Sequence, residues 1–343
     1  MLHTASSESE HKVFEDGMNA EAVTRETFDS LAAIQSDPRS PLRWSSPFVL
    51  PLWLEAWWRS FGRGRPDILA VRRRGEPIGV APLMIQGNTA RLIGDVNVCD
   101  HLDVITAPEE AEVFFQALCD HLRLRGVHRL DLELLRPDSI VLREIVPAAR
   151  RRGLTVEIEP KDASLELALP GSWESYLKML TGKQRHELRR KLRRIDQTAP
   201  HVFQTVSDQE RLAAAMEVFF KLFRSNRRDK SDFMQEPMIT FFKTLSQSLA
   251  EENRLRLFFL EVRGVPAAAA MCFHHHGTMY LYNSAYDEQY QSLSAGILCK
   301  ALSIRESIRS GMKVYDLLRG AETYKRHLGG QPVTLYRCTI ELR

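Results

Sequence analysis

The amino-acid sequence predicts an α+β (α/β) protein built from two similar domains with mixed sheets. Its 343 residues are too many for one average domain and suit two domains of roughly 150 to 200 residues. Segments with a hydrophobic period of two alternate with segments of helical period, which favours sheets flanked by helices. The same order of elements then recurs in the second half of the chain.

The first half shows this order of elements. Proline suits the first position of a helix, and large apolar residues follow Pro51 at helical spacing up to Phe61. Alternating segments separated by a turn then predict a pair of strands, and Gly126 is expected to end the next helix. The predicted elements are a helix over 51–61, strands over 68–74 and 78–85, a helix over 109–125 and a strand over 128–134.

Two short matches indicate that the second half repeats the first. The turn Arg74-Gly-Glu-Pro77 matches Arg263-Gly-Val-Pro266. The run Arg125-Gly-Val-His-Arg-Leu-Asp-Leu132, which ends a helix and begins a strand, aligns with Ser310-Gly-Met-Lys-Val-Tyr-Asp-Leu317. A common order of hairpin, capped helix and strand ending in Asp-Leu favours a duplication over chance agreement.

The segment between the two matches carries mostly helical patterns. The expected elements are a helix over 139–152, short strands near 156 and over 165–169, a long helix over 173–194, and helices over 209–224 and 237–251. Residues 1–25 have few large apolar side chains, which predicts a flexible tail. We therefore predict a tail over 1–25, an N-terminal domain over 26–170 and a C-terminal domain over 171–343.

Composition narrows the location and the partners. A net charge of +3 makes no overall case for nucleic-acid binding. Five scattered cysteines fit neither a disulfide framework nor a zinc site and predict a reducing compartment. The first residues are polar and acidic rather than basic and then apolar, and no window approaches the length that spans a bilayer. The expected location is the cytoplasm, including the periphery of the inner membrane.

The run Gln291-Ser-Leu-Ser-Ala-Gly296 is a candidate phosphate-binding loop. It lies between a predicted strand over 279–286 and a predicted helix over 297–309. A helix N-terminus exposes unpaired N–H groups and the positive end of the dipole, and small residues such as Ser294, Ala295 and Gly296 allow a pyrophosphate to approach the backbone. The alternative interpretation is an ordinary serine N-cap.

A resemblance to a known superfamily becomes specific at two places. Gln291 and Gly296 match the GNAT pattern of Gln or Arg, two residues, Gly, one residue and Gly or Ala, with Ser294 in place of the first glycine. The run Tyr315-Asp-Leu-Leu-Arg-Gly-Ala-Glu-Thr-Tyr-Lys325 resembles the signature of CelD/BcsL-type GNAT acetyltransferases of cellulose and exopolysaccharide biosynthesis. The similarity runs from about Pro47 to Arg343, and the group is related to the Fem-type aminoacyl ligases.

The resemblance implies tandem GNAT-like domains, each a mixed, mainly antiparallel sheet flanked by helices. It implies acyl-CoA, acetyl-CoA or a longer thioester, as cosubstrate, with direct transfer to an amine or hydroxyl of an envelope, polysaccharide or small acceptor. The stretch of the first half that corresponds to the loop, Ile105-Thr-Ala-Pro-Glu-Glu-Ala, has no glycine and carries two carboxylates. The second half is therefore expected to hold the cofactor, and the first half to be a degenerate domain that shapes the acceptor site.

The second candidate region supplies the groups that acyl transfer needs. Asp316 is a candidate base for the acceptor, since a carboxylate in a partly desolvated cleft can take a proton. The resemblance assigns Tyr324 as the acid that protonates the leaving thiolate. Lys325 and Arg319 are candidates to stabilise negative charge or to hold an anionic acceptor. The alternative is that Asp316 caps the following turn and Lys325 is solvated.

The run His274-His-His276 does not predict a metal site. Neighbours on a strand point to opposite faces, and the sequence supplies no nearby acidic or cysteine partner. No metal is expected. His275, together with Tyr282 and Asn283 on the next strand, is a candidate for the acceptor cleft.

The segment 183–194 is strongly basic, with seven Lys or Arg residues among twelve. Apolar residues keep one side of the predicted helix hydrophobic, so it is a candidate for binding anionic lipid, RNA or a phosphorylated acceptor. A solvated helix face beside a core seam is the alternative. Two other functions stay open: a Fem-like ligase that uses aminoacyl-tRNA, and a non-catalytic scaffold with the same fold.

Overall fold

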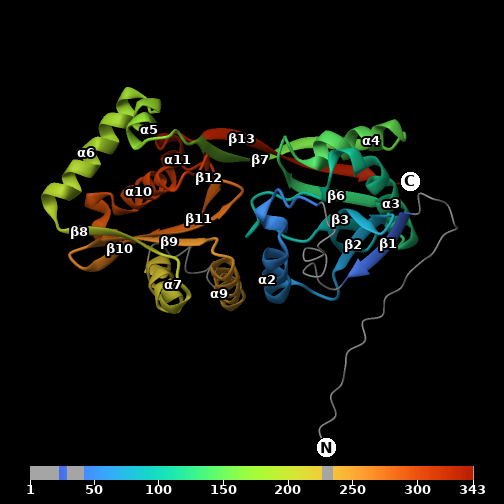
Figure 1. Ribbon diagram of the computed structural model, residues 1–343, viewed down its shortest axis with the longest axis horizontal. Coiled ribbons are helices and arrows are strands. Elements are labelled where there is room, and N and C mark those ends of the chain that lie inside the picture. The colour runs from blue at the N-terminus through green and yellow to red at the C-terminus, as the bar shows by residue number, and fades with distance from the viewer. Residues whose placement is uncertain (1–22, 29–41, 226–234, 343) are drawn as a thin grey trace, which may run out of the picture. The chain divides into compact units, whose positions relative to one another are not determined.

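The computed structural model describes residues 23–28, 42–225 and 235–342 (Figure 1). The chain divides into two compact units. Unit 1 comprises Met1–Trp58, Gly62–Lys161 and Leu335–Arg343, and unit 2 comprises Arg59–Phe61 and Asp162–Thr334.

The predicted tail over residues 1–25 lies outside the described residues except for its last three. Residues 23–25 belong to strand β1 (Val23–Phe28), which pairs antiparallel with β2 (Asp67–Arg73). Residues 23–25 therefore lie in the sheet rather than in the predicted tail.

Unit 1 is a mixed sheet with helices. Its strands run in the order β1-β2-β3-β4-β6, followed by residues of β13 and β7, and β4–β6 is a parallel pair. Helix α3 contacts β1, β2 and β3. The remaining elements are α2 (Pro51–Phe61), β3 (Glu76–Gln86), β4 (Thr89–Leu92), β5 (Ile105–Thr106), α3 (Ala111–Leu124), β6 (Arg129–Leu135), α4 (Val146–Arg151), β7 (Val156–Ala168) and β13 (Gln331–Glu341).

Unit 2 has the same construction, with strand order β7-β12-β11-β10-β9-β8 and one parallel pair, β11–β12. The fold class predicted from the sequence is confirmed in both units. The elements are α5 (Trp173–Met179), α6 (Gly182–Thr198), β8 (His201–Val206), α7 (Gln209–Ser225), α9 (Glu236–Glu251), β9 (Leu255–Val262), β10 (Val265–His275), β11 (Thr278–Tyr286), η4 (Glu288–Leu293), α10 (Ala295–Arg309), β12 (Val314–Arg319) and α11 (Thr323–His327).

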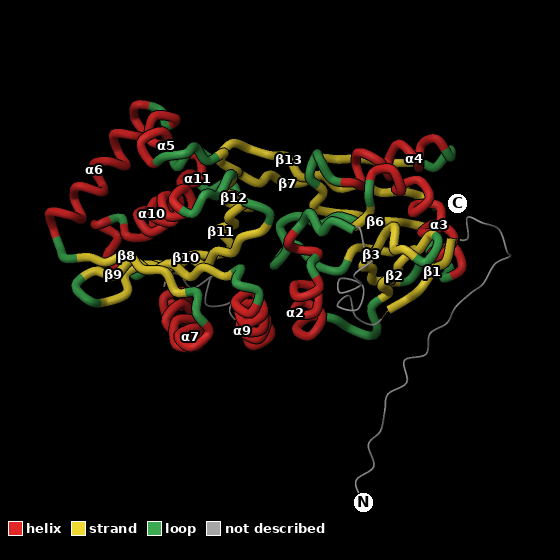
Figure 2. The backbone as a smooth tube through the Cα atoms, in the orientation of Figure 1, coloured by secondary structure: helices red, strands yellow, loops and turns green. Residues whose placement is uncertain are grey.

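Helices cover both faces of the sheet of unit 2 (Figure 2). Helix α10 contacts β9, β10 and β11 on one face, whereas α7 and α9 contact the strands from the other. Side chains of a strand alternate between faces, and on β10 Ala268, Ala270 and Cys272 belong to the core that α10 shares with α5 and α6. The small residues of β10 allow α10 to lie close to the sheet.

The two units share the same hairpin turn and the same helix end, at the places where the two sequence matches lie. Arg74 (φ 54°) and Gly75 (φ 81°) join β2 to β3, and Arg263 (φ 54°) and Gly264 (φ 74°) join β9 to β10. Two successive left-handed residues form the hairpin turn whose twist suits antiparallel strands. Both crossover helices end on a left-handed glycine: the Val127 amide bonds to the Leu122 carbonyl after α3, and Met312 to Ser307 after α10.

The repeat extends to the strand that follows each crossover helix. Leu134 in β6 has φ 59° and Leu318 in β12 has φ 60°, and the register with the neighbouring strand shifts at both places. A left-handed leucine is costly, so its recurrence at matching places supports a duplication.

The units are interleaved in sequence. The division falls inside β7, after Lys161, and inside β13, after Thr334. The two ends of β13 therefore belong to different units, and its last residues pair with β6. The sequence predicts two contiguous domains, 26–170 and 171–343, whereas each unit of the structure includes residues from both of these ranges. Strand exchange between repeats leaves no mark in local periodicity, so the sequence could not predict it.

The predicted long helix over 173–194 is two helices. Thr181 begins α6 with a capping box, in which its hydroxyl accepts from the Gln184 amide and the Gln184 side chain accepts from the Thr181 amide. Strand β7 is continuous where two short strands were expected, and β8 and β13 are additional strands whose partners lie far away in sequence.

We predict that the hairpin turn of unit 2 depends on glycine for its backbone and not for space. A Cβ at Gly264 would meet no atom within 4 Å, yet the positive φ penalises any side chain. Gly264→Ala should lower the free energy of unfolding in urea by about 1 kcal/mol. Gly171→Ala is the matched control, since that site is equally open and has no positive φ. Equal effects of the two changes would contradict the prediction.

Candidate functional site

Strands β11 and β12 separate after a short parallel ladder. Among the described residues their register covers only Thr278–Tyr280 opposite Val314–Asp316, although β11 continues to Tyr286. A bulge leaves Tyr282 without a register partner in β10. Ligands of sheets with parallel strands bind beyond the carboxyl ends of the strands, where neighbours diverge. Helix α10 starts at this end of β11.

The N-terminus of α10 is open. The helix begins at Ala295, two residues before the predicted start, and no side chain caps it. Ser294 adopts a left-handed backbone (φ 58°, ψ 35°), and its carbonyl accepts from the amides of Ile297 and Leu298. Ser294 thus occupies the N-cap position without acting as the cap, contrary to the alternative interpretation of this serine. The positive end of the helix dipole remains unneutralised by any capping side chain.

Two cations of the basic helix α6 meet at this N-terminus. Lys191 Nζ lies 3.1 Å and an Arg194 terminal nitrogen 3.0 Å from Ser294 Oγ, which accepts both hydrogen bonds. The Arg194 Nε atom is buried and has no hydrogen-bond partner among the described residues. Lys191 also pairs with Glu187 at 2.8 Å, and hydrogen bonds from Arg190 and Lys191 lower the pKa of Glu187 to about 2. The arrangement concentrates positive charge where an anion would meet the α10 dipole.

Sequence reasoning missed this pairing, although it singled out both segments. Gln291 is exposed, and its carbonyl accepts from the Ser294 amide at 2.8 Å. Gly296 is buried, and a Cβ there would lie 3.0 Å from the ring of Tyr286 at the end of β11. The glycine therefore permits close packing of α10 on β11, in addition to any approach by a ligand.

Asp316 and Lys325 both form hydrogen bonds with the backbone of Leu318 in β12. Asp316 Oδ1 accepts from the Leu318 amide at 2.7 Å and from the Ser164 hydroxyl at 3.0 Å. Lys325 Nζ donates to the Leu318 carbonyl at 3.1 Å and to the carbonyl of Arg319. Both side chains are buried, at 2% and 3% exposure. Together they stabilise the left-handed backbone of Leu318.

Unit 1 holds its equivalent leucine differently. The Leu134 carbonyl accepts from the Leu102 amide, a backbone group. Asp131, which aligns with Asp316, instead accepts from Arg91 and Arg337, and hydrogen bonds from these two residues lower its pKa against the opposing effect of burial. The charged pair around the bulge is a feature of unit 2.

Tyr324 is linked to the start of α10 through Lys300, a residue that sequence reasoning did not select. Lys300 Nζ lies 4.7 Å from the centre of the Tyr324 ring and donates to the Gly296 carbonyl at 3.2 Å. Burial, followed by the charges of Glu322 and Cys272, raises the pKa of Tyr324 above its ordinary value. The phenol is therefore neutral and can donate a proton. Lys300 could have been identified from the sequence as a lysine within the apolar pattern of the predicted helix over 297–309.

The predicted acceptor residues are not brought together. His275 is buried, and its Nδ1 accepts from Arg254 at 2.7 Å. It pairs with Thr278, at the end of β11 away from α10. Tyr282 packs on Phe242 of α9 with ring centres 5.5 Å apart, on the face of the sheet opposite α10.

The other two polar candidates have protein partners of their own. Asn283 Oδ1 accepts from the amide of Ser284. Arg319 forms an ion pair with Asp162 at 3.3 Å.

We predict that Lys325 is required for the stability of unit 2. Lys325→Met should lower the free energy of unfolding by about 3 kcal/mol, because the buried carbonyls of Leu318 and Arg319 lose a charged donor. Lys183→Met on the exposed side of α6 should change it by less than about 0.5 kcal/mol. Urea denaturation of both variants measures this, and a loss below about 1 kcal/mol for Lys325→Met would refute the assignment.

We also predict that Tyr324 ionises later than an exposed tyrosine. Ultraviolet titration should give the same tyrosinate signal for the wild type and Tyr324→Phe up to about pH 11 while the protein stays folded. A raised pKa in the folded state contributes stability that is complete below the usual pKa and is lost as pH rises through the folded value. The wild type should therefore lose stability relative to Tyr324→Phe above about pH 10. A tyrosinate signal near the usual pKa that disappears in the variant would contradict this.

A protein-family comparison matches part of unit 2. Residues 182–326 match the family model described as an acetyltransferase (GNAT) domain, and they include α6, the Ser294 turn, β12 and Tyr324. No curated protein sequence matches the chain.

Solved structures show the same fold at low sequence identity. FemX has a TM-score of 0.59 and 11% identity over 85% of this chain and 92% of its own. The C-terminal domain of a putative lysylphosphatidylglycerol synthetase from Agrobacterium fabrum has values of 0.55 and 12% over 83% and 87%. L-PGS from Bacillus licheniformis has values of 0.53 and 11% over 84% and 91%. These structures share the fold of this chain over most of its length, and the GNAT domain model covers residues 182–326.

The described residues contain no group of three His, Cys, Asp or Glu side chains placed to hold a metal ion. None of the helices within the described ranges combines the length and apolarity that crossing a membrane requires.

Proposed function

We propose that this chain transfers an acyl group from acyl-CoA to an amine or hydroxyl acceptor and that unit 2 carries the site. The observation that supports this most directly is the convergence of Lys191 and Arg194 on Ser294 at the uncapped N-terminus of α10. A pyrophosphate there would meet the helix dipole and two side-chain cations, and the unpartnered Arg194 Nε supplies a further donor. The family match over 182–326 supports the same cofactor.

Tyr324 is the proposed acid in a direct transfer. The acceptor nitrogen or oxygen attacks the thioester carbon, its proton passes to a base or to water, and the tetrahedral oxyanion collapses with cleavage of the carbon–sulfur bond. The thiolate then takes the phenol proton of Tyr324, whose raised pKa keeps that proton in place before transfer. We assign Asp316 and Lys325 as positioning residues, since their polar atoms hold Leu318.

The acceptor class rests on resemblance. The run Tyr315–Lys325 resembles CelD/BcsL-type acetyltransferases, which favours an envelope, polysaccharide or small amine or hydroxyl acceptor on the cytoplasmic side. A second candidate function is aminoacyl transfer from charged tRNA, favoured by the extended likeness to FemX. The two differ in the donor: acyl-CoA in one case and aminoacyl-tRNA in the other.

We predict that acetyl-CoA binding depends on both cations of the Ser294 site. In titration calorimetry Lys191→Ala and Arg194→Ala should each weaken binding by roughly tenfold to a hundredfold, because each removes a charge-assisted hydrogen bond to phosphate. Lys183→Ala, on an exposed position of the same helix, should have no effect. Acetyl-pantetheine lacks the pyrophosphate, so its weaker binding should not respond to any of the three changes. Tyr324→Phe should keep the affinity and slow transfer by about 100-fold.

The outcomes separate the candidate functions. Absence of acyl-CoA binding would overturn the proposal. Transfer from aminoacyl-tRNA in the absence of acyl-CoA binding would favour the Fem-like ligase. Binding of acyl-CoA without transfer to any acceptor tested would favour a scaffold.

A further inference from the structure

A second basic site lies on the other flank of α6. A pocket of about 640 Å³ is lined by residues of α5 and α6. Trp173, Leu177 and Leu192 supply its apolar lining, and Arg185, Arg189, Arg193 and His186 supply its basic lining. No carboxylate lines it. The pocket is therefore amphiphilic, with one kind of charge.

The positive charge of this pocket is not neutralised within the described part of the chain. Arg189 and Arg193 are exposed and have no ion-pair or hydrogen-bond partner there. Arg190, between them, pairs with Glu187 at 2.8 Å. Arg185 donates to the carbonyls of Leu177 and Lys178 at the end of α5 at 3.4 Å, which fixes one wall of the pocket. Arg189 and Arg193 thus offer their charge to the pocket rather than to a carboxylate of the protein.

This site is distinct from the one at Ser294. Residues three or four apart share a helix face, so Arg189 and Arg193 lie together, and Lys191 and Arg194 lie together on another side. Leu188 and Ile195 are buried in the core and occupy the face between these two flanks. Helix α6 therefore presents cations both to the start of α10 and to the α5–α6 pocket.

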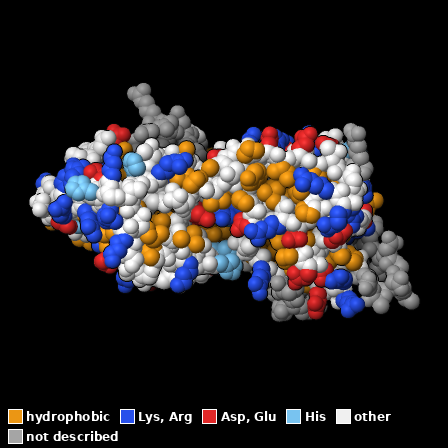
Figure 3. All heavy atoms as spheres, turned by 90° about the horizontal axis from the view of Figure 1, so that it is seen from above, with side chains coloured by type: hydrophobic (Ala, Val, Ile, Leu, Met, Phe, Trp, Pro, Cys, Tyr) orange, Lys and Arg blue, Asp and Glu red, His pale blue; other side chains and the backbone are white. Residues whose placement is uncertain are grey.

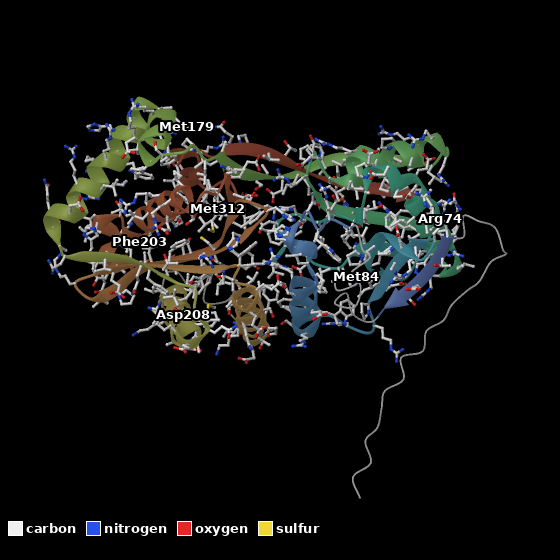
Figure 4. The ribbon with its side chains drawn as sticks, viewed as in Figure 1. Arg74, Met84, Met179, Phe203, Asp208 and Met312 are labelled. Atoms are coloured by element: carbon white, nitrogen blue, oxygen red, sulfur yellow. The ribbon has the colours of Figure 1, made fainter. Side chains whose placement is uncertain are left out.

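The pocket combines apolar and basic surface. Met179, the last residue of α5, is 54% exposed and does not line the pocket (Figure 4). Figure 3 looks onto the side of unit 2 that carries α5 and α6, where Lys and Arg side chains predominate over Asp and Glu. Apolar side chains beside unpaired arginines match an amphiphile that carries a phosphate, whereas a nucleic-acid backbone offers no apolar group to Leu177 and Leu192.

We propose that the α5–α6 pocket docks unit 2 onto a membrane surface containing anionic phospholipid. Arg189 and Arg193 bind the lipid phosphate, and the apolar lining of Trp173, Leu177 and Leu192 contacts the glycerol and upper acyl region. The inference does not depend on the identity of the acyl donor. It does imply that an acceptor carried by the membrane would be held close to unit 2.

The test is cosedimentation of the full chain with vesicles of phosphatidylcholine, with and without phosphatidylglycerol. The wild type should bind only the anionic vesicles. Arg189→Glu with Arg193→Glu should reduce the bound fraction by about tenfold or more. Lys183→Glu with Arg190→Glu is the matched control, because it changes the charge of the same helix equally outside the pocket.

Equal loss in the pocket and control variants would overturn the proposal, since general attraction to the surface would then explain the binding. Binding of RNA in place of vesicles, abolished by Arg189→Glu with Arg193→Glu, would overturn it in favour of a nucleic-acid partner. The circular dichroism spectrum should stay unchanged in both double variants. That control shows that the variants are folded without relying on acyl-CoA binding, which separates this test from that of the acyl donor.

Discussion

The left-handed backbone of Leu318 is the constraint on which the rest of unit 2 depends. A leucine adopts φ 60° only when its surroundings stabilise that conformation, and here a carboxylate accepts from its amide while an ammonium donates to its carbonyl. The resulting bulge shifts the register of β12 against β7. It also precedes the turn into α11, which carries Tyr324 toward Lys300 and the start of α10. Two buried charged residues therefore act mainly through the backbone that they hold.

The two units show how a repeated framework can carry a site in one copy. Both have the left-handed hairpin turn, the glycine that ends the crossover helix and the left-handed leucine in the following strand. In unit 1, Asp131 forms ion pairs with arginines of neighbouring strands, and a backbone amide holds Leu134. The bulge therefore does not require the charged pair. Asp316 and Lys325 add to unit 2 a rigid strand end next to an open helix N-terminus.

Helix α6 connects the features that distinguish unit 2. Its apolar stripe packs into the core shared with α10, which sets the rotation of the helix. Given that rotation, Lys191 and Arg194 reach Ser294, and Arg189 and Arg193 face the pocket beside α5. In our proposals, the cations on the two flanks of α6 allow one helix to bind two anionic ligands.

The sequence by itself determined the elements with strong periodicity, the turns at Gly75 and Gly264, the glycine that ends α10 and the loop at Ser294, because each depends on contacts within a few residues. It also indicated the duplication and the α+β class. Only the tertiary structure decided what surrounds the candidate residues. Lys191 reaches Ser294 across about 100 residues of sequence, and Ser164 reaches Asp316 across about 150. Sequence reasoning also could not predict the exchange of β7 and β13 between the units or the partner of His275. Strand pairing and burial join residues whose distance along the chain carries no information about their distance in space.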